Sequence, residues 1–239
     1  ETARWTWVEQ QAREVCARYG FAEIRIPIVE RTELFSRSIG DTTDIVEKEM
    51  YSFEDRDGSS LTLRPEGTAS IVRAYVEHAM QQKEPVSKLF YLGPMFRRER
   101  PQKGRLRQFA QIGVEVIGRD DAAIDAEVLL LLHDLLSGLE IRGPQIELNS
   151  LGDATCRPPY RDALLAFGQA HRAALCENCS RRLERNPLRL LDCKNPECRT
   201  ATADAPVMLD HLCGPCRAHF DAVCAVLRRE GVGYRLNSR

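Results

Sequence analysis

Residues 91–118 are the part of the sequence that most limits how this chain can fold. They read YLGPMFRRERPQKGRLRQFAQIGVEVIG, with apolar residues in both halves. Pro101 and Gly104 interrupt the middle, and both residue types are common in turns. The pattern predicts two strands joined by a loop. We therefore expect an antiparallel hairpin at the centre of the fold.

The loop between these strands concentrates positive charge. The segment from Arg97 to Arg107 contains five arginines and one lysine, and Glu99 is its only acid. Arginine suits phosphate groups because its planar guanidinium donates two parallel hydrogen bonds and keeps its charge. A solvated basic loop is the ordinary alternative for such a run of charges.

The strand after the loop favours a binding site over that alternative. Gln111, Gly113 and Glu115 alternate with isoleucine and valine, so one face of the strand is polar or bare and the other is apolar. A polar face beside a loop of cations indicates the floor of a site that holds an anionic ligand.

The composition is that of a globular protein. The 239 residues are 43% hydrophobic and 29% charged, with a formal net charge of −1, which predicts one large domain or two smaller ones. Nucleic acid would have to meet a local basic patch, because the chain as a whole is not basic. No run of about 18 apolar residues occurs, so we expect no membrane span.

The cysteines are unevenly distributed. Six of the nine lie between Cys176 and Cys216, with the spacings C-x2-C, C-x4-C and C-x2-C, while Cys16, Cys156 and Cys224 resemble isolated packing residues. Clustered cysteines in a chain of this size indicate a metal site more than disulfides, and they predict a reducing cytoplasmic setting.

Two of these spacings predict the ligands of a tetrahedral zinc site. We expect Cys193 and Cys198 to be reserve ligands. The alternative is a small packed domain with reduced cysteines. The predicted zinc ligands are Cys176, Cys179, Cys213 and Cys216.

Hydrophobic periodicity predicts a mixture of helices and strands. The predicted helices cover residues 2–19, 32–39, 68–80, 121–139, 158–170 and part of 206–230. The predicted strands outside the central hairpin cover residues 21–29, 50–53, 60–64, 144–149 and 233–236. Helices alternating with mainly hairpin-linked strands favour an α+β fold with an antiparallel sheet flanked by helices.

Two local features qualify this assignment. Pro27 lies inside the first predicted strand, so that strand should be at an edge or an interface. Glu66 and Thr68 lie where a strand meets a helix. Thr68 is either a helix cap or a site residue, and a carboxylate such as Glu66 is favoured at a helix start by the helix dipole.

Three segments together resemble the histidyl-tRNA synthetases, which are class II aminoacyl-tRNA synthetases, and the similarity runs over nearly the whole chain. Residues 21–40 resemble the first class II motif. Residues 63–69 (LRPEGTA) resemble the loop that binds the substrate amine. Residues 96–118 resemble the second class II motif in its histidine-specific form, with RPQKGR in the loop.

The resemblance implies roles for individual residues. Arg97 is the expected catalytic residue, and it would bind the α-phosphate of ATP and the carboxylate of the amino acid. Glu99 and Arg105 would hold the nucleotide together with Arg97, and ATP would enter with Mg²⁺. The residues expected around histidine are Glu66, Gly67, Thr68, Arg97, Gln111 and Glu115.

The resemblance also implies partners and an organisation. The partners would be L-histidine, ATP, tRNA(His) and a second copy of the chain in a homodimer, with Pro27 at the interface. Residues 1–170 would form the catalytic core, 171–230 a cysteine-rich helical insertion, and 231–239 the return to the core. The family continues into a third motif and an anticodon-binding domain, so we expect these 239 residues alone to be weakly active or inactive.

Two other functions compete with the ligase. The first is the histidine-sensing regulatory subunit of ATP phosphoribosyltransferase, a paralogue that lacks the anticodon domain. The RPEGT and QKGR segments argue against it, because a sensor does not need arginines for ATP phosphates. The second is a zinc-dependent RNA-binding module, which would rest on the cysteines alone and would leave the hairpin unexplained.

Overall fold

The computed structural model describes residues 1–39, 49–99 and 102–237, so the predicted turn residue Pro101 lies outside the described part. The chain divides into two compact units, which are described separately. The sheet unit comprises Glu1–Asp120 and Glu127–Arg142. The cysteine unit comprises Asp121–Ala126 and Gly143–Arg239.

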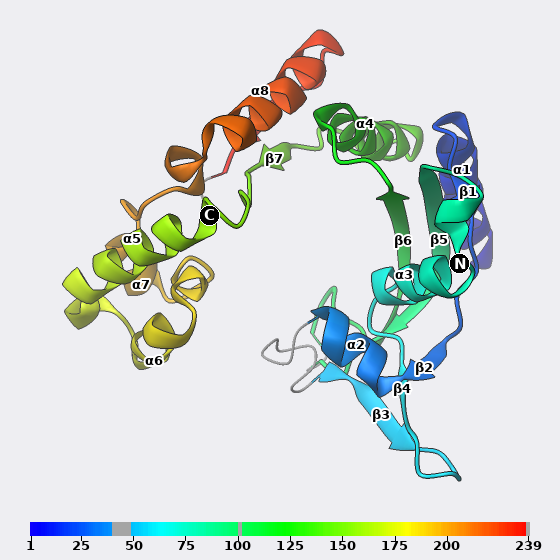
Figure 1. Ribbon diagram of the computed structural model, residues 1–239, viewed down its shortest axis with the longest axis horizontal. Coiled ribbons are helices and arrows are strands. Elements are labelled where there is room, and N and C mark those ends of the chain that lie inside the picture. Colours follow the sequence, from blue (N-terminus) through cyan, green and yellow to red (C-terminus); the bar gives the residue numbers. More distant parts are fainter. Residues whose placement is uncertain (40–48, 100–101, 238–239) are drawn as a thin grey trace. The chain divides into compact units, whose positions relative to one another are not determined.

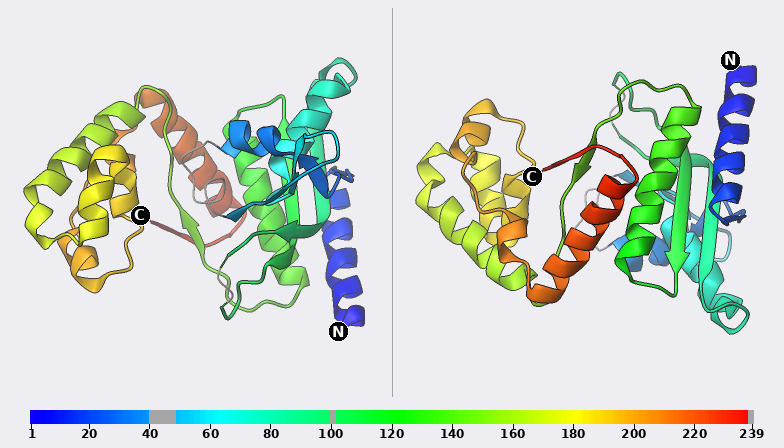
Figure 2. Two further views of the ribbon diagram at one scale, coloured as in Figure 1. Left: turned by 90° about the horizontal axis from the view of Figure 1, so that it is seen from below. Right: turned by 90° about the horizontal axis from the view of Figure 1, so that it is seen from above.

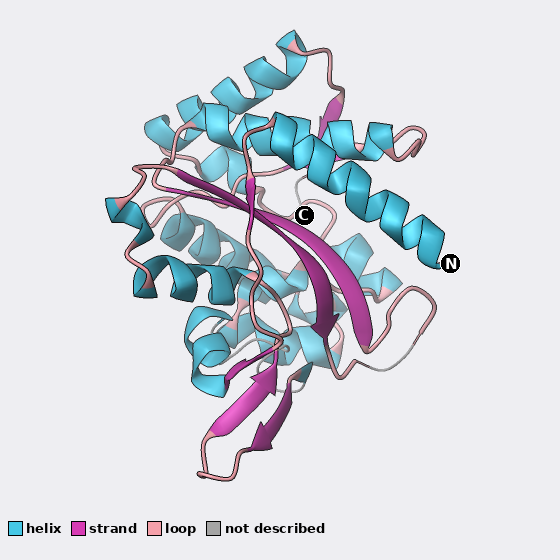
Figure 3. Cartoon of the chain, turned by 90° about the vertical axis from the view of Figure 1, so that its right-hand side faces the viewer, coloured by secondary structure: helices cyan, strands magenta, loops and turns pink. Residues whose placement is uncertain are grey.

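The predicted hairpin is the main sheet of the sheet unit. Strand β5 (Ser87–Phe96) runs antiparallel to β6 (Gln108–Ile117) in an unbroken register from Ser87 opposite Ile117 to Phe96 opposite Gln108 (Figure 3). The short strand β1 (Ala22–Glu23) pairs with β5 in parallel, giving the order β1-β5-β6. The long register fixes which side chains share a face, because side chains alternate along each strand.

One face of this sheet is covered by two helices, α1 (Thr2–Arg18) and α4 (Ala122–Gly138) (Figures 1 and 2). The apolar face of β6 that the sequence predicted packs here. The buried members of this core are Ala12, Val15, Cys16, Phe21, Phe90, Leu131 and Leu135. Because the helices take up this face, the opposite face is the one left to form a site.

The opposite face is covered only in part, by helix α3 (Thr68–Glu77), which is followed by the short 3-10 helix η2 (Met80–Gln82). Ile71 of this helix is buried against the strands. Its partners in the core are Leu89, Tyr91 and Met95. The helix therefore begins at the edge of the polar strip predicted on β6.

A second antiparallel sheet has the order β2-β4-β3. Its strands are β2 (Val29–Arg31), β4 (Ser60–Leu63) and β3 (Tyr51–Glu54), and helix α2 (Thr32–Ile39) follows β2 directly. The β3–β4 hairpin turns at Gly58, whose φ of +82° suits glycine. The strands predicted over residues 50–53 and 60–64 are thus the two halves of this hairpin.

The single strand predicted over residues 21–29 is wrong. Two short strands, β1 and β2, belong to different sheets and lie at the edge of each, as the proline suggested. The carbonyls of Ile26 and Pro27 do not enter a ladder but accept hydrogen bonds from Arg64 Nη1, at 2.6 and 3.2 Å. Arg64 Nε also donates to the carbonyl of Pro94. A buried guanidinium thus replaces the missing strand pairing.

The cysteine unit contains mainly helices. Its two strands, β7 (Ile146–Leu148) and β8 (Tyr234–Leu236), pair in parallel. Its α-helices are α5 (Arg157–Ala170), α6 (Glu177–Arg185), α7 (Pro196–Ala201) and α8 (Gly214–Arg229). Three 3-10 helices connect them: η3 (Arg172–Ala174), η4 (Pro187–Leu190) and η5 (Met208–His211).

Two small cores hold these short helices, and cysteines take part in both. One core includes Cys179, Leu183, Leu190 and Cys198, and the other includes Cys156, Tyr160, Leu164 and Met208. Helix α5 contributes to both, so it packs with the cysteine-bearing helices. The expected boundaries of the catalytic core and the insertion, at residues 170 and 230, stay a prediction.

The fold class predicted from the sequence is confirmed, with parallel pairs added at β1–β5 and β7–β8. None of the described helices is both long and apolar enough to cross a membrane.

Candidate functional site

The floor of the candidate site is the ring of Tyr91 on β5. Tyr91 pairs with Gly113 across the sheet and is only 2% exposed. A methyl group added to Gly113 or to Gly67 would overlap the tyrosine ring, so the ring is enclosed between two glycines. Burial, with the nearby Glu115 and Glu66 carboxylates, raises the pKa of Tyr91 to about 12. The phenol therefore remains a neutral hydrogen-bonding group.

The wall of the site is the corner that leads into α3. Glu66 accepts hydrogen bonds from the backbone N–H groups of Thr68 (2.6 Å) and Ala69 (3.0 Å), and so it caps the helix. Thr68 itself does not cap. Its hydroxyl donates to Glu115 on β6 at 2.6 Å, which joins the corner to the polar strip of the sheet.

Acceptor atoms dominate this part of the site. Burial is the main cause that raises the pKa of Glu115, and the Glu66 carboxylate adds to it, while the Thr68 hydrogen bond opposes it. Gln111 Oε1 is buried and has no hydrogen-bond partner among the described residues. A buried acceptor without a partner is costly, which makes it a natural contact for a ligand that donates hydrogen bonds.

Arg97 stands at the rim, just after β5. Its Nε donates to the carbonyl of Pro65 at 3.0 Å, and its guanidinium carbon lies 5.1 Å from the centre of the Phe109 ring. Within the described residues its two terminal nitrogens make no hydrogen bond. The side chain is therefore positioned by one nitrogen and stacked on an aromatic ring, with two nitrogens available to an anion.

The basic loop has a folded tip. Arg105 N donates to the carbonyl of Gln102, and Gly104 between them has a φ of +82°. The Arg105 guanidinium donates to Glu99 at 3.0 Å, and the Glu99 side chain is mostly buried while that of Arg105 is half exposed. Glu99 and Arg105, both predicted to hold a nucleotide, are thus paired with each other in this structure.

The structure brings most of the predicted site residues together. Glu66, Gly67, Thr68 and Glu115 surround Tyr91, and Arg97 is tied to the same corner through Pro65. Gln111 shares their strand face. The roles assigned to these residues stay predictions.

Sequence reasoning missed two residues that support this site. Tyr91 was noted only as the start of the hairpin, although its place opposite Gly113 follows from the strand register. Arg64 was noted only as part of a motif. It is 4% exposed, and burial lowers its pKa. A lone arginine just after a strand gives no signal in the sequence that its side chain will bind the backbone of another segment.

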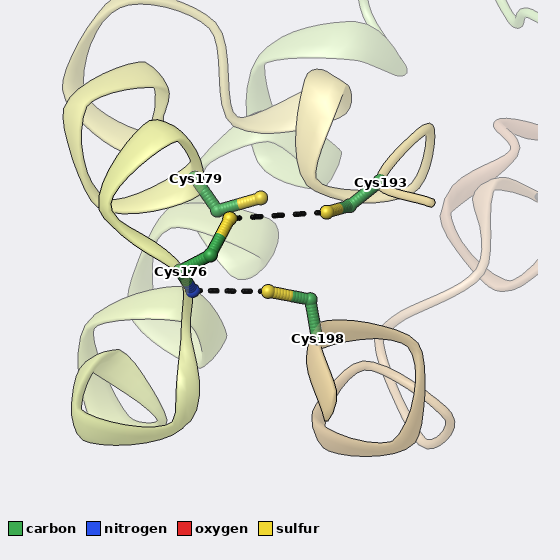
Figure 4. Close-up of side chains that lie close together, drawn as sticks. All are labelled: Cys176, Cys179, Cys193 and Cys198. Atoms are coloured by element: carbon green, nitrogen blue, oxygen red, sulfur yellow. Dashed lines mark hydrogen bonds between the residues drawn. The ribbon is translucent and has the colours of Figure 1, made fainter. Parts of the chain in front are cut away.

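The cysteine unit holds a second kind of candidate site, the four-cysteine cluster of Cys176, Cys179, Cys193 and Cys198 (Figure 4). Their sulfur atoms all lie within 4.8 Å of one another. Cys176 and Cys193 are separated by 4.0 Å between sulfurs, and Cys176 N donates to Cys198 Sγ at 3.0 Å. Hydrogen bonds, first that from the backbone of Cys179, lower the pKa of Cys176 to about 7.

A separate aspartate cluster comprises Asp153, Cys156, Cys213 and Cys216, again with ligand atoms within 4.8 Å of one another. The predicted zinc site is therefore corrected. Its four proposed ligands are divided between two clusters, because each C-x2-C begins a different helix, α6 or α8. The reserve residues Cys193 and Cys198 complete the first cluster, and Cys156, which resembled a packing residue, belongs to the second.

Comparison with known proteins agrees with this geometry. A family model described as "Histidyl-tRNA synthetase" matches residues 1–155. The "Histidine--tRNA ligase" of Geobacter metallireducens is 56% identical over the whole chain, which spans 58% of that protein. The protein of the same name from Trichlorobacter lovleyi is 57% identical, and the chain spans 57% of its length.

Solved structures give the same result. The apo histidyl-tRNA synthetase of S. aureus is 34% identical, with a TM-score of 0.76, and the match covers all of this chain and 54% of that one. A structure titled as an ATP phosphoribosyltransferase regulatory subunit/histidyl-tRNA synthetase from Bacillus halodurans shares the fold. Its TM-score is 0.60 at 19% identity, and the match covers 96% of this chain and 62% of that one.

Proposed function

The chain belongs to the histidyl-tRNA synthetase family, and from that membership we propose that it forms the adenylate-forming site of a histidine–tRNA ligase. In this reaction L-histidine and ATP give histidyl-adenylate, and histidine is then transferred to tRNA(His). The observation that carries the proposal is the division of the site into two parts. Acceptor groups gather on one face of the sheet at the start of α3, and cations gather in the adjoining loop, with Arg97 tied to the corner between them.

The acceptor groups on this face of the sheet suit histidine. An α-amino group is a cation with three donors, and an imidazole ring carries one or two N–H groups. Glu66, Glu115 and Gln111 offer acceptor oxygens, and the Tyr91 ring supplies a fixed surface below them. Gly67 and Thr68 form the wall, where a side chain at Gly67 would displace the tyrosine ring.

The loop suits ATP. In the proposed step a carboxylate oxygen of histidine forms a bond to the α-phosphorus, and the bond to the pyrophosphate oxygen breaks. Both reactants are anions, so fixed positive charge is expected to stabilise the transition state. The terminal nitrogens of Arg97, which have no hydrogen bond within the described residues, would contact the histidine carboxylate and the α-phosphate, while Glu99 and Arg105 would hold the rest of the nucleotide.

Magnesium is expected with ATP, and the described residues of the loop fit it poorly as ligands. They are mainly hydrogen-bond donors, and the Glu99 carboxylate is already paired with Arg105. Magnesium prefers oxygen ligands and keeps several waters. We therefore assign no magnesium ligand to this loop, and the phosphates themselves would carry the ion.

A histidine-sensing regulatory subunit is the second candidate, favoured by the fold likeness to the Bacillus halodurans protein. Such a subunit would keep the histidine pocket and would not need the arrangement at Arg97. The positioned guanidinium and the folded basic loop support the ligase.

We propose that the sheet unit forms a homodimer through β2 and the neighbouring helices. Ile28 and Val29 are 45% and 40% exposed beside Pro27. A groove of about 810 Å³ opens between α2 and α3 and is lined by the apolar side chains of Leu34, Val72 and Val76 among charged ones. Replacing Pro27 and Ile28 by aspartate should weaken the dimer in sedimentation velocity, and unchanged sedimentation would contradict this interface.

We propose that residues 1–170 act as the catalytic core, that 171–230 form an insertion that contacts tRNA, and that 231–239 return to the core. Arg181, Arg182 and Arg185 on α6 give the insertion a basic face for phosphates. The four-cysteine cluster would hold a structural zinc ion that takes no part in the reaction. All nine cysteines are free thiols, which supports a reducing cytoplasm as the site of action.

Histidine-dependent exchange of pyrophosphate into ATP tests the proposed function. We would compare this chain with a version extended to the length of the Geobacter metallireducens relative. Exchange that is strong in the extended protein and weak in this chain is the expected result. If neither exchanges and histidine still binds, the regulatory subunit becomes the better proposal.

A further inference from the structure

We propose that the aspartate cluster is a second zinc site, independent of the four-cysteine site, so that the chain binds two zinc ions. Asp153 and Cys156 come from the segment between β7 and α5. Cys213 and Cys216 come from the start of α8, nearly 60 residues further along the chain. The proposal concerns metal content and does not depend on the ligase reaction.

The two clusters share one local design. Cys176 and Cys213 each occupy the cap position before a helix in an extended conformation, with φ of −65° in both and ψ of 159° and 164°. The second cysteine of each C-x2-C lies three residues further on, in the first turn, so its sulfur comes back beside the first. The start of each helix therefore presents a pair of sulfurs.

An equivalent hydrogen bond brings a third sulfur to each pair. The backbone N–H of Cys176 donates to Cys198 Sγ at 3.0 Å, and the backbone N–H of Cys213 donates to Cys156 Sγ at 3.1 Å. Each bond brings in a cysteine from a distant segment as the third ligand. Zinc-bound thiolates carry negative charge, which a hydrogen bond from a helix N-terminus stabilises.

The fourth ligand distinguishes the clusters. In the aspartate cluster, Asp153 Oδ1 accepts hydrogen bonds from the N–H groups of Thr155 and Cys156, both at 2.9 Å. These bonds orient the carboxylate, and its other oxygen, Oδ2, points to Cys213 Sγ at 3.6 Å. Zinc bonds to sulfur and oxygen of about 2.3 and 2.1 Å in tetrahedral geometry predict an S–O separation of about 3.6 Å.

No cysteine of either cluster forms a disulfide. The sulfurs of Cys176 and Cys193 are 4.0 Å apart, whereas a disulfide requires about 2.05 Å. For four thiolates around zinc, the corresponding sulfur separation is about 3.8 Å. Three thiolates and one carboxylate within 4.8 Å of one another are likewise a tetrahedral donor set of the kind that zinc accepts.

The backbone at Gly152, beside the aspartate cluster, lies close to Met208 and Cys156. Gly152 has a φ of +59°, and a methyl group on it would overlap Met208 and crowd Cys156. Cys156 is 1% exposed and packs in the small core with Tyr160 and Met208. A zinc ion here would fasten the start of α5 to the start of α8 and so close the polypeptide between them.

Metal analysis of the whole chain tests the proposal. The chain is purified under reducing conditions and dialysed against metal-free buffer. Inductively coupled plasma mass spectrometry should then find about two zinc ions per chain. Cys213→Ser with Cys216→Ser should leave one ion, and Cys176→Ser with Cys179→Ser should also leave one. A matched control, Cys16→Ser in the sheet unit, should leave both.

A cobalt titration covers the case in which a double variant does not fold. The unmodified chain, freed of metal, should take up two equivalents of Co²⁺ with tetrahedral absorption bands. The thiolate charge-transfer absorption should be weaker for the three-thiolate site than for the four-thiolate site. Asp153→Asn should lower the cobalt affinity of the three-thiolate site only. Two zinc ions retained in the Cys213/Cys216 variant, or only one equivalent of cobalt taken up by the unmodified chain, would overturn the proposal.

Discussion

The site on the sheet and the two cysteine clusters are held in place by different means. The sheet site rests on a long paired hairpin, with helices packed against its far face and a tyrosine ring enclosed by two glycines. The clusters rest on short helices, such as the nine residues of α6 and the six of α7, around two small cores.

This difference indicates where each part gets its stability. Ladder hydrogen bonds and burial of apolar side chains specify the positions of Tyr91 and Glu115 before any ligand arrives. Helices shorter than about 12 residues are marginal by themselves, so the cysteine unit needs further constraints. Ligand bonds to a metal supply such constraints, because the free energy of binding a structural metal is also free energy of folding.

Removing metal should therefore have the largest effect, and it should fall on one region only. Structural zinc in small peptides contributes about 10–16 kcal/mol at pH 7. After chelation, amide hydrogen exchange should become fast over α5 to α8 and stay slow over β5 and β6. Adding Zn²⁺ back should restore protection, with Ca²⁺ as the control. Equal loss of protection in both regions would contradict the contrast drawn above.

The next effect in size concerns Arg97. Replacing it by alanine in the extended protein should slow adenylate formation about 100-fold or more, the scale for losing one transition-state contact. Arg98→Ala is the matched control, because Arg98 is exposed and its backbone, not its guanidinium, makes the contact recorded with Glu49. Pyrophosphate exchange measures both variants, and a rate near that of the unchanged protein would refute the role of Arg97.

Glu115→Gln should show what the acceptor pocket contributes. A hydrogen bond to a charged group contributes about 1.5–3 kcal/mol, so histidine affinity should fall about 10- to 100-fold. Calorimetry measures this change. Exposed Glu54→Gln serves as the control.

The same variant has a predicted pH dependence. The folded-state pKa of Glu115 is raised, so its contribution to stability is present at low pH and is lost as the pH rises through that pKa. Glutamine cannot ionise. The free energy of unfolding of the variant should therefore gain on that of the unchanged chain as the pH rises above about 4, the usual glutamate range, toward the raised pKa of folded Glu115. A constant difference would show that Glu115 is not strained by burial.

Gly113→Ala should have the smallest effect, on stability more than on chemistry. The added methyl group overlaps the Tyr91 ring, and overpacking of this kind costs about 1–3 kcal/mol. Gly233→Ala is the control, because no atom lies within 4 Å of the added methyl group. Urea unfolding compares them, and equal midpoints would mean that the ring can move aside.

The sequence predicted the hairpin, most helices and the composition of the sheet site, because each depends on local patterns. Alternation along β6 separated Gln111, Gly113 and Glu115 from the core residues. The strand over residues 21–29 failed for a non-local reason, since the carbonyls of Ile26 and Pro27 are taken by the side chain of Arg64.

The cysteine ligands failed for a similar reason. Spacing identified two C-x2-C pairs, but it did not determine which third and fourth ligands meet each pair. Cys156 gave no signal because its partner Cys213 lies 57 residues away, and an aspartate such as Asp153 is common in turns. Only the tertiary arrangement of helix starts shows the two sets.

The enclosed ring of Tyr91 has a consequence for substrate choice. A buried ring held between two close backbone positions adapts little to a near relative of the substrate. In the proposed histidine site, an amino acid of similar shape that lacks the ring N–H groups would leave the buried acceptor of Gln111 without a partner among the described residues. A site built to accept hydrogen bonds rejects such analogues by factors of about 10⁴–10⁵. Gly67 and Gly113, by enclosing this ring, would then contribute to the accuracy with which the proposed enzyme selects its amino acid.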